Sequence, residues 1–211
     1  MIKHNIILLA YNEEAGIRNA LEGLDGYSVV VVVDGDDNTA SIAREMGADV
    51  FASKEKRGYG MALRDGLLYS YAAGNDRATV MDVGTCDPQW IETGMRDDIV
   101  IRNRTFTGLS RRFIISKIAS VCLSIAVGKV VKDATFGYRT YRLDSIVGLL
   151  PLLKSNGHAT NMELLGLAHK SGLSVGYMPA PYQLDANSQL RSKDFKEALR
   201  VIWKTLYTHQ S

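Results

Sequence analysis

Acidic side chains follow three apolar runs of this sequence, close to the point where each run ends. Asp34 comes directly after the run 28–33, Asp82 comes directly after the run 78–81, and Glu13 stands shortly after a first run. The carboxyl ends of parallel strands lie at the same edge of a sheet, and open α/β sheets bind ligands at this edge. We therefore expect these carboxylates to share a site. Carboxylates placed there accept hydrogen bonds from a nucleobase or ribose, or hold a divalent cation that neutralises a phosphate.

Each of these acids also has a simpler explanation. Asp is a preferred N-cap of helices, and Asp82 could merely cap the segment that starts at Pro88. For any single acid, capping is the commoner role. Acids that recur at the same edge of three successive strands instead favour a ligand site.

Strand-like runs alternate with helical spacing in the first part of the chain. The predicted strands are 5–10, 28–33, 49–52 and 78–81, and the predicted helices are 15–24, 40–46 and 61–73. This alternation predicts right-handed crossovers and a mostly parallel sheet. Past Pro88 we expect a strand at 98–101 and an apolar helix at 113–131, then a short strand followed by the segment 143–153. A helix at 162–170, a strand at 174–182 and a basic amphipathic helix at 193–206 complete the chain. The expected fold is a single α/β domain over residues 1–211.

The composition is that of a soluble globular protein. The chain has 211 residues, 46% hydrophobic and 23% charged, with a formal net charge of +2, so any basic surface must come from local clustering. The chain has two cysteines, which are too few for a disulfide framework and favour a reducing compartment. Their spacing does not match a metal-binding cysteine pattern. The apolar region 113–131 contains two lysines and falls short of a clean span of ~20 residues. With no leader-like start, we expect a cytoplasmic protein, either free or peripheral at the cytoplasmic face of the membrane.

The glycine-rich turn at 57–60 opens a predicted helix. Arg57 stands at its start and Gly58 follows. Unpaired backbone amides at a helix N-terminus, together with an arginine, form a natural anion site.

Six motifs occur in an order that resembles a known family. They are Ala-Tyr-Asn-Glu-Glu at 10–14, Val-Val-Asp at 32–34, Arg-Gly-Tyr-Gly-Met-Ala-Leu-Arg-Asp-Gly at 57–66, Met-Asp at 81–82, Asp-Pro at 87–88 and Asp-Ala-Thr-Phe-Gly-Tyr-Arg at 133–139. This set resembles the inverting GT-A glycosyltransferases of the dolichyl-phosphate mannose synthase and polyprenyl-phosphate glycosyltransferase type, over nearly the whole chain. The resemblance implies a Rossmann-like central sheet flanked by helices, with a nucleotide-sugar-binding half at 1–88 and an acceptor-binding half at 89–211.

The resemblance also implies roles for individual residues. The donor, a UDP- or GDP-linked sugar, would contact Tyr11, Glu13, Asp34, Asp36, Arg57, Gly58 and Asp82. Asp133 falls beside the reacting sugar and is the candidate general base or positioning carboxylate, with Asp82 as the other catalytic residue. The acceptor would contact Arg104, Arg111, Arg112 and Arg139.

The metal motif departs from the family pattern. The family has two acids separated by one residue, whereas Gly84 stands here in place of the second acid after Asp82. A divalent metal (Mg²⁺ or Mn²⁺) would therefore need Asp87, water or the donor phosphates to complete its ligands, or metal dependence is weakened.

Three functions are consistent with these residues. The first is transfer of a sugar to a polyprenyl-phosphate-type lipid at a membrane surface, with the helices at 113–131 and 193–206 lying against the membrane. The second keeps the donor but uses a hydroxyl acceptor, such as a hydroxymethylated base in DNA, with the basic residues contacting DNA phosphates. The third is a degenerate, non-catalytic nucleotide-sugar-binding domain, which the missing second acid motivates.

Overall fold

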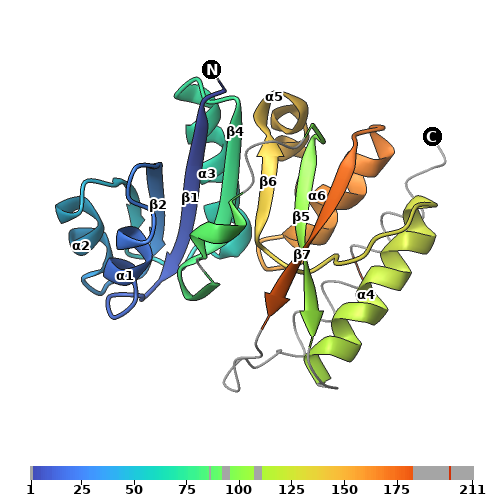
Figure 1. Cartoon of the computed structure of the whole chain (residues 1–211), viewed down its shortest axis with the longest axis horizontal. Helices are drawn as coiled ribbons and strands as arrows, with labels where there is room; N and C mark the ends of the chain where they lie inside the picture. Colours follow the sequence, from blue (N-terminus) through green and yellow to red (C-terminus); the bar gives the residue numbers. More distant parts are fainter. Residues whose placement is uncertain (1, 86, 92–95, 107–110, 183–199, 201–211) are drawn as a thin grey trace.

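A computed structural model describes residues 2–85, 87–91, 96–106, 111–182 and 200 of the chain. Seven strands of this described part form one sheet in the order β3-β2-β1-β4-β6-β5-β7 (Figure 1). They are β1 (His4–Tyr11), β2 (Ser28–Asp34), β3 (Asp49–Ser53), β4 (Arg77–Asp82), β5 (Ile99–Phe106), β6 (Arg139–Arg142) and β7 (Val175–Tyr182). The mostly parallel α/β sheet predicted from the sequence is confirmed.

The direction of the strands divides the sheet into two parts. Strands β3, β2, β1 and β4 are all parallel, as the strand–helix alternation predicts. Strand β6 runs antiparallel to both of its neighbours, β4 and β5, and β5 pairs in parallel with β7. The antiparallel strand therefore joins the regular first half to the second half of the chain.

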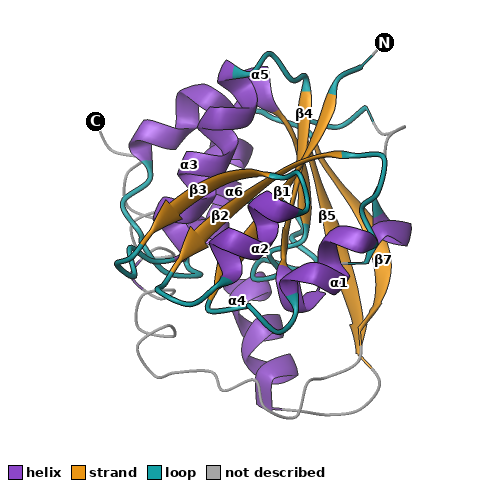
Figure 2. Ribbon diagram, turned by 90° about the vertical axis from the view of Figure 1, so that its left-hand side faces the viewer, coloured by secondary structure: helices purple, strands orange, loops and turns teal. Residues whose placement is uncertain are grey.

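Helices cover both faces of the sheet (Figure 2). Alternate residues of β1 and β2 point to opposite faces: Ile7 and Val32 pack with α3 (Tyr59–Ala72), α4 (Arg111–Val127) and α6 (Thr160–Lys170). On the other face, Ile6 and Val31 pack with α1 (Ile17–Glu22) and α2 (Thr39–Glu45). Burial on both faces is the physical reason why these strands are continuous apolar runs.

The remaining elements are short. They are α5 (Leu143–Ile146) and the 3₁₀ helices η1 (Val83–Thr85), η2 (Pro88–Trp90) and η3 (Val147–Leu152). The short strand expected before residue 143 is β6, and the segment 143–153 is α5 followed by η3, which contains Pro151. The apolar helix predicted at 113–131 ends at Val127, because Gly128 has a φ of 67°. The helix predicted at 193–206 lies outside the described residues, except for Arg200.

None of the described helices is both long and apolar enough to span a membrane.

Candidate active site

The carboxyl ends of β1, β2 and β4 lie side by side at one edge of the sheet. In the strand register, Tyr11 stands opposite Asp34, and Leu9 stands opposite Asp82. Glu13 follows β1 by two residues, and the negative charge of Asp82 raises the pKa of its carboxyl group. The structure therefore brings the three acids predicted from the sequence to one edge. We call Glu13, Asp34 and Asp82 the acidic rim.

The carboxylate of Glu13 lies within the electrostatic influence of Asp82 and Asp37. Burial raises the pKa of Glu13, and the carboxylates of Asp82 and Asp37 raise this pKa further. A cation at this edge would relieve the repulsion between the carboxylates.

Side chains at the ends of β1 and β2 tie the two following loops together. The backbone amide of Glu13 donates to Thr39 Oγ1 at 2.8 Å, and that of Glu14 donates to Asp37 Oδ2 at 3.0 Å. Asn38 donates to Glu14 Oε2 through both its backbone amide and its side-chain amide, each at 3.1 Å. Glu14 and Asp37 thus hold the loops that carry the acidic rim.

Gly35 allows these two loops to approach closely. It has a φ of 126°, and a Cβ atom at this position would collide with Asn12 Oδ1. Asn12 is itself left-handed, with a φ of 53°, and its Oδ1 accepts from the backbone amide of Asp36 at 3.3 Å. The side chain of Asp36 is exposed, and its role in donor binding stays a prediction.

The anion site predicted at the turn before α3 is already filled by a side chain of the protein. Asp34 Oδ2 accepts from the backbone amides of Arg57 and Gly58, each at 2.9 Å. The guanidinium of Arg57 donates to Asp34 Oδ1 at 3.1 Å and to Asp65 Oδ2 at 2.6 Å. The amides that the sequence predicts to be free for a diphosphate therefore bind the buried carboxylate of Asp34, which corrects that expectation.

Tyr11 presents an aromatic ring at the end of β1. The ring is exposed, and the ammonium of Lys56 lies 3.5 Å from its centroid. This distance is that of a cation–π contact, in which Lys56 covers one face of the ring. The arrangement provides a stacking surface beside the acidic rim.

Tyr59 lies near Asp82 and is held by Asn161, and neither residue was predicted from the sequence to belong to the site. A Cβ atom at Gly137 would lie 2.7 Å from Tyr59 Oη and 3.5 Å from Asp82 Oδ2, so the phenol and the carboxylate both lie close to this glycine. Asn161 Nδ2 donates to Tyr59 Oη at 3.0 Å. Burial, and then the charge of Asp82, raise the pKa of Tyr59 well above its usual value, which keeps the phenol neutral. The only sequence signal for Tyr59 is its position between Gly58 and Gly60.

Gly60 allows the start of α3 to pack closely against the loop that precedes α6. Its amide donates to Asn156 O at 2.8 Å, and an added Cβ atom would lie 2.5 Å from Ser155 O and 2.9 Å from Asn156 Cα. Since these atoms belong to the backbone, they cannot move aside without shifting the loop. We expect Gly60→Ala to lower the free energy of unfolding by about 1–3 kcal/mol, measured by urea denaturation.

Gly148→Ala is the matched control, because a Cβ atom at Gly148 would meet no atom within 4 Å. Its free energy of unfolding is expected to stay within about 0.5 kcal/mol of the wild-type value. Equal stability of the two variants would contradict the close contact between α3 and the loop at 155–156.

Asp87 caps the short helix η2. Its Oδ1 accepts from the backbone amide of Gln89 at 3.0 Å, and its carbonyl accepts from Tyr138 Oη at 3.0 Å. The capping role considered for Asp82 therefore belongs to Asp87. A metal-binding role for Asp87 stays a prediction.

The residues at the acidic rim fit a divalent cation only in part. Within the residues that the structure describes, no group of three His, Cys, Asp or Glu side chains could hold a metal ion. Asp82 and Glu13 offer carboxylate oxygens, which suit Mg²⁺ or Mn²⁺, and their repulsion favours a cation between them. Such an ion would need further ligands from water or from the phosphates of a donor.

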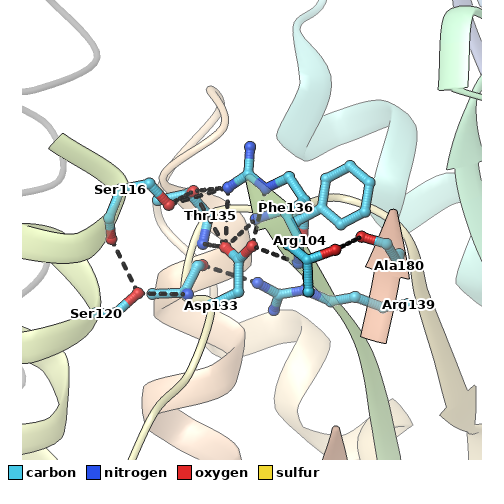
Figure 3. Close-up of polar contacts among 10 residues, drawn as sticks. Arg104, Ser116, Ser120, Asp133, Thr135, Phe136, Arg139 and Ala180 are labelled. Atoms are coloured by element: carbon cyan, nitrogen blue, oxygen red, sulfur yellow. Dashed lines mark hydrogen bonds and ion pairs between the residues drawn. The ribbon is translucent and has the colours of Figure 1, made fainter. Parts of the chain in front are cut away.

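Asp133 and Arg104 form a buried ion pair with two parallel contacts (Figure 3). Arg104 Nε donates to Asp133 Oδ2 at 2.8 Å and Arg104 Nη2 donates to Oδ1 at 2.9 Å. The same Nη2 donates to Ser116 Oγ on α4 and to Thr135 Oγ1. Both side chains of the pair are at most 3% exposed. Ser116 and Thr135, which the sequence did not single out, complete this network.

The carboxylate of Asp133 is held in its ionised form. Burial alone would raise its pKa, but the hydrogen bonds and charge of Arg104, with the backbone amides of Thr135 and Phe136, lower it below the usual value. A carboxylate with this many donors accepts a proton poorly. This geometry suits the positioning role given as one of the two alternatives for Asp133.

The other predicted acceptor residues differ in what the structure shows of them. Arg139 is 0% exposed, and it donates to the backbone carbonyls of Phe136, Ala134 and Asn161. The structure thus places Arg139 in the core, where it ties the loop at 134–137 to α6. Arg111 and Arg112 begin α4, but their side chains lie outside the described part of the structure.

Comparison with solved structures identifies the class of fold. Glucosyl-3-phosphoglycerate synthase of Mycobacterium tuberculosis, crystallised with Mn²⁺, UDP and phosphoglyceric acid, aligns with a TM-score of 0.74. The alignment covers 98% of this chain and 79% of the synthase at 17% sequence identity. The same enzyme with UDP alone gives a TM-score of 0.73 over 97% of this chain and 80% of the synthase, at 18% identity. The fold is the GT-A glycosyltransferase fold predicted from the sequence.

Sequence comparison finds a family match in the first part of the chain and relatives over most of its length. Residues 5–95 match the family described as Glycosyl transferase family 2. A dolichyl-phosphate hexose transferase of Haloferax volcanii is 29% identical over 196 residues, which cover 84% of this chain and 82% of the relative. A UDP-N-acetylglucosamine–dolichyl-phosphate N-acetylglucosaminyltransferase of Methanococcus voltae is 24% identical over 242 residues, covering 95% of this chain and 94% of the relative. The family match thus covers the first part of the chain, and the glycosyltransferase predicted from the sequence is confirmed.

Proposed function

We propose that this glycosyltransferase moves a sugar, with inversion, from a nucleotide-sugar to the phosphate of a polyprenyl-phosphate-type lipid. Two relatives that align over most of the chain are named as transferases of dolichyl phosphate, which supports a lipid-phosphate acceptor. The structures that share the fold include complexes with UDP, which supports a nucleotide-linked donor.

The state of Asp133 is the observation that carries the choice of acceptor. A hydroxyl acceptor has to lose its proton to a general base during transfer. A phosphate monoester has a second pKa of about 6, so its attacking oxygen carries no proton at neutral pH. Asp133, the acid that the resemblance puts beside the reacting sugar, is buried, ionised and fully engaged with Arg104. This arrangement supports a phosphate acceptor, which needs no base.

In this proposal the acidic rim binds the donor. Tyr11 provides a stacking surface for the base, while Glu13 and Asp34 lie near the base and ribose. Asp82, together with Glu13, would hold a divalent ion, which when bound neutralises charge on the departing nucleoside diphosphate. Arg57 orients Asp34 and the turn before α3.

In the same proposal Asp133 acts as a positioning residue. It fixes the guanidinium of Arg104 and orders the loop at 133–136 that follows α4. The acceptor phosphate is bound by the basic residues at the start of α4, Arg111 and Arg112. The division into a donor half at 1–88 and an acceptor half at 89–211 follows from this assignment.

A screen of donors against acceptors tests the proposal. The full chain is incubated with UDP- and GDP-linked sugars and with three acceptors: a polyprenyl phosphate, the corresponding polyprenol, and DNA that contains hydroxymethylated bases. We expect transfer to the polyprenyl phosphate and none to the polyprenol, because only the phosphate offers an oxygen without a proton. The transfer rate should fall as the pH drops below about 6, where the phosphate becomes protonated. Transfer to DNA but not to the lipid phosphate would contradict the proposal.

A further inference from the structure

A group of polar side chains lies beside Asp82, at the carboxyl edge of the sheet. Tyr59 comes from the start of α3, Asn161 from the first turn of α6, and Gly137 from the loop that leads into β6. Asn161 is fully buried, and its backbone carbonyl accepts from Arg139 Nη1 at 2.7 Å, which fixes the start of α6. Segments far apart in the sequence therefore meet next to Asp82, where the proposed mechanism gives Tyr59 no role.

The hydroxyl of Tyr59 is arranged to donate a hydrogen bond. Its oxygen accepts from Asn161 Nδ2 at 3.0 Å. A phenol that accepts one hydrogen bond still has its own proton to donate, and the bond from Asn161 directs that proton away from the amide. Tyr59 can therefore serve as a donor to a third group, with Asn161 holding the hydroxyl in place.

Gly137 leaves the space in front of this hydroxyl open. A Cβ atom at Gly137 would lie 2.7 Å from Tyr59 Oη and 3.5 Å from Asp82 Oδ2, so a side chain here would take up the space beside both oxygens. Gly137 is not among the glycines with a positive φ, so its backbone conformation does not require glycine. What this position provides is the absence of a side chain beside Tyr59 and Asp82.

A hydrogen-bond donor beside an acceptor matches a hydroxyl group. Tyr59 offers an O–H group, and Asp82 offers a carboxylate oxygen. A ligand hydroxyl can accept from the phenol and donate to the carboxylate at the same time. A phosphate oxygen would be repelled by Asp82, and an ammonium group has no lone pair with which to accept from Tyr59. The pair therefore favours a neutral hydroxyl, and a sugar carries several of them.

The order of the strands puts this pair at the sugar end of a bound donor. Tyr11 and Asp34, the residues predicted to bind the base and ribose, end β1 and β2, whereas Asp82 ends β4 on the other side of β1 and Gly137 precedes β6 (Figure 1). Neighbouring strands lie about 4.8 Å apart, so β6 is roughly 10 Å beyond β1. The base and the sugar of a nucleotide-sugar lie on opposite sides of its diphosphate. A base on Tyr11 therefore directs the sugar toward Gly137.

We propose that Tyr59 is a specificity-determining residue of the donor site: its hydroxyl, held by Asn161, binds one hydroxyl group of the transferred sugar together with Asp82 Oδ2. The inference rests on the proposed function, because it takes the donor to be a nucleotide-sugar bound along the acidic rim. A carboxylate has two oxygens, so this use of Oδ2 leaves Oδ1 for a divalent ion. Tyr59 thus contacts the sugar and not the nucleotide, and binding measurements can separate these two parts of the donor.

Calorimetric titration of the full chain in the presence of Mn²⁺, without any acceptor, tests this inference. The ligands are UDP-glucose, UDP-N-acetylglucosamine and GDP-mannose, each compared with its free nucleoside diphosphate. We expect Tyr59→Phe to weaken the binding of the nucleotide-sugar by about fivefold, the loss of one hydrogen bond between neutral groups, and to leave binding of the free nucleotide unchanged. Equal losses for both ligands would overturn the inference, because Tyr59 would then support the nucleotide site or the fold. Failure of the wild-type chain to bind any of the three nucleotide-sugars would overturn it as well.

Analogues of the nucleotide-sugar that binds most tightly, each lacking one hydroxyl of the sugar, locate the contact. One analogue should bind equally to the wild type and to Tyr59→Phe, since the group that Tyr59 contacts is then missing from the sugar. The other analogues should keep the difference of about fivefold between the two proteins. A difference that persists with every analogue would contradict the proposed contact between Tyr59 and a sugar hydroxyl.

Tyr69→Phe is the matched control for Tyr59→Phe. Tyr69 lies on the same helix, α3, and its hydroxyl donates to a carboxylate, Asp49 Oδ2, at 2.8 Å. This variant should bind every nucleotide and nucleotide-sugar like the wild type. A loss in Tyr69→Phe as large as that in Tyr59→Phe would overturn the inference, because any hydroxyl removed from α3 would then have the same effect.

Gly137→Ala is a second variant, which keeps both the hydroxyl of Tyr59 and the carboxylate of Asp82. Its methyl group would occupy the space beside the two oxygens, so it should weaken binding of the nucleotide-sugar by about fivefold or more and leave the free nucleotide unaffected. Gly148→Ala is its control, because a Cβ atom there would meet no atom within 4 Å. Wild-type affinity of Gly137→Ala for the nucleotide-sugar would contradict a sugar hydroxyl at this place.

Binding without an acceptor separates this inference from the proposed function. If Tyr59→Phe loses affinity for the nucleotide-sugar alone, and the wild type transfers no sugar to polyprenyl phosphate, then the proposed acceptor is wrong and the role of Tyr59 stands. If the wild type transfers sugar to polyprenyl phosphate, and Tyr59→Phe binds the nucleotide-sugar as tightly as the wild type does, then only the role of Tyr59 is wrong.

Discussion

Replacing Asp82 with Asn is expected to lower the rate of sugar transfer by at least about a hundredfold, since it removes a charge at the centre of the acidic rim while keeping the shape of the side chain. The carboxylate lies at the end of β4, next to β1, and close to Tyr59 and Gly137. Release of nucleoside diphosphate from the donor, measured over a range of Mg²⁺ and Mn²⁺ concentrations, gives the rate. The variant should also require more metal to reach its own maximum.

Asp25→Asn is the control for this variant. Asp25 is exposed in the loop after α1, away from the carboxyl ends of the strands, and its loss changes the net charge equally. We expect wild-type rates and an unchanged melting temperature for Asp25→Asn. Full activity of Asp82→Asn would contradict both the metal-binding and the catalytic roles predicted for Asp82.

Replacing Arg104 with Met is expected to lower the free energy of unfolding by about 3–5 kcal/mol, because it leaves the carboxylate of Asp133 buried without its cation. The Arg104 side chain donates four hydrogen bonds: two to Asp133 at 2.8 and 2.9 Å, one to Thr135 Oγ1 at 2.7 Å and one to Ser116 Oγ at 3.0 Å. At roughly 2–4 °C per kcal/mol for a domain of this size, the melting temperature should fall by about 10 °C. Urea denaturation and thermal unfolding measure the two quantities.

A double variant separates a structural role of Arg104 from a ligand-binding one. Arg104→Met with Asp133→Leu removes both charges, so it should recover part of the stability that the single variant loses. If Arg104→Met is instead as stable as the wild type but loses transfer to the lipid phosphate, then Arg104 serves the acceptor directly. That outcome would contradict the positioning role proposed for Asp133 and restore the acceptor role predicted from the resemblance.

The sequence was sufficient to predict the first half of the sheet. The runs 5–10 and 28–33 are apolar at every or nearly every position, which is expected only where both faces of a strand are buried. Helical spacing between these runs requires parallel strands, and parallel strands bring their carboxyl ends to one edge. The neighbourhood of Tyr11, Asp34 and Asp82 therefore followed from local patterns.

Past residue 98 the local patterns were less informative. The sequence predicted a strand at 98–101 that gives way to a basic loop, yet β5 continues through Arg102 and Arg104 to Phe106. These residues stay extended because they pair with Met178 and Ala180 of β7, which lie 76 residues later in the chain. Charged residues within a strand have no periodic signature, so only the pairing partner reveals the strand.

Local patterns in the sequence are sufficient to predict the class of fold, the acidic edge and the class of enzyme, because these depend on residue type and spacing along short stretches. Which charges neutralise one another, by contrast, is visible only in the folded chain. Asp34 binds Arg57 and Asp133 binds Arg104, across separations of 23 and 29 residues in the chain. The sequence predicted all four side chains to contact donor or acceptor, whereas in the structure they bind each other. Electrostatic and hydrogen-bond partners depend on distance in space, which is fixed only when the strands and helices have packed.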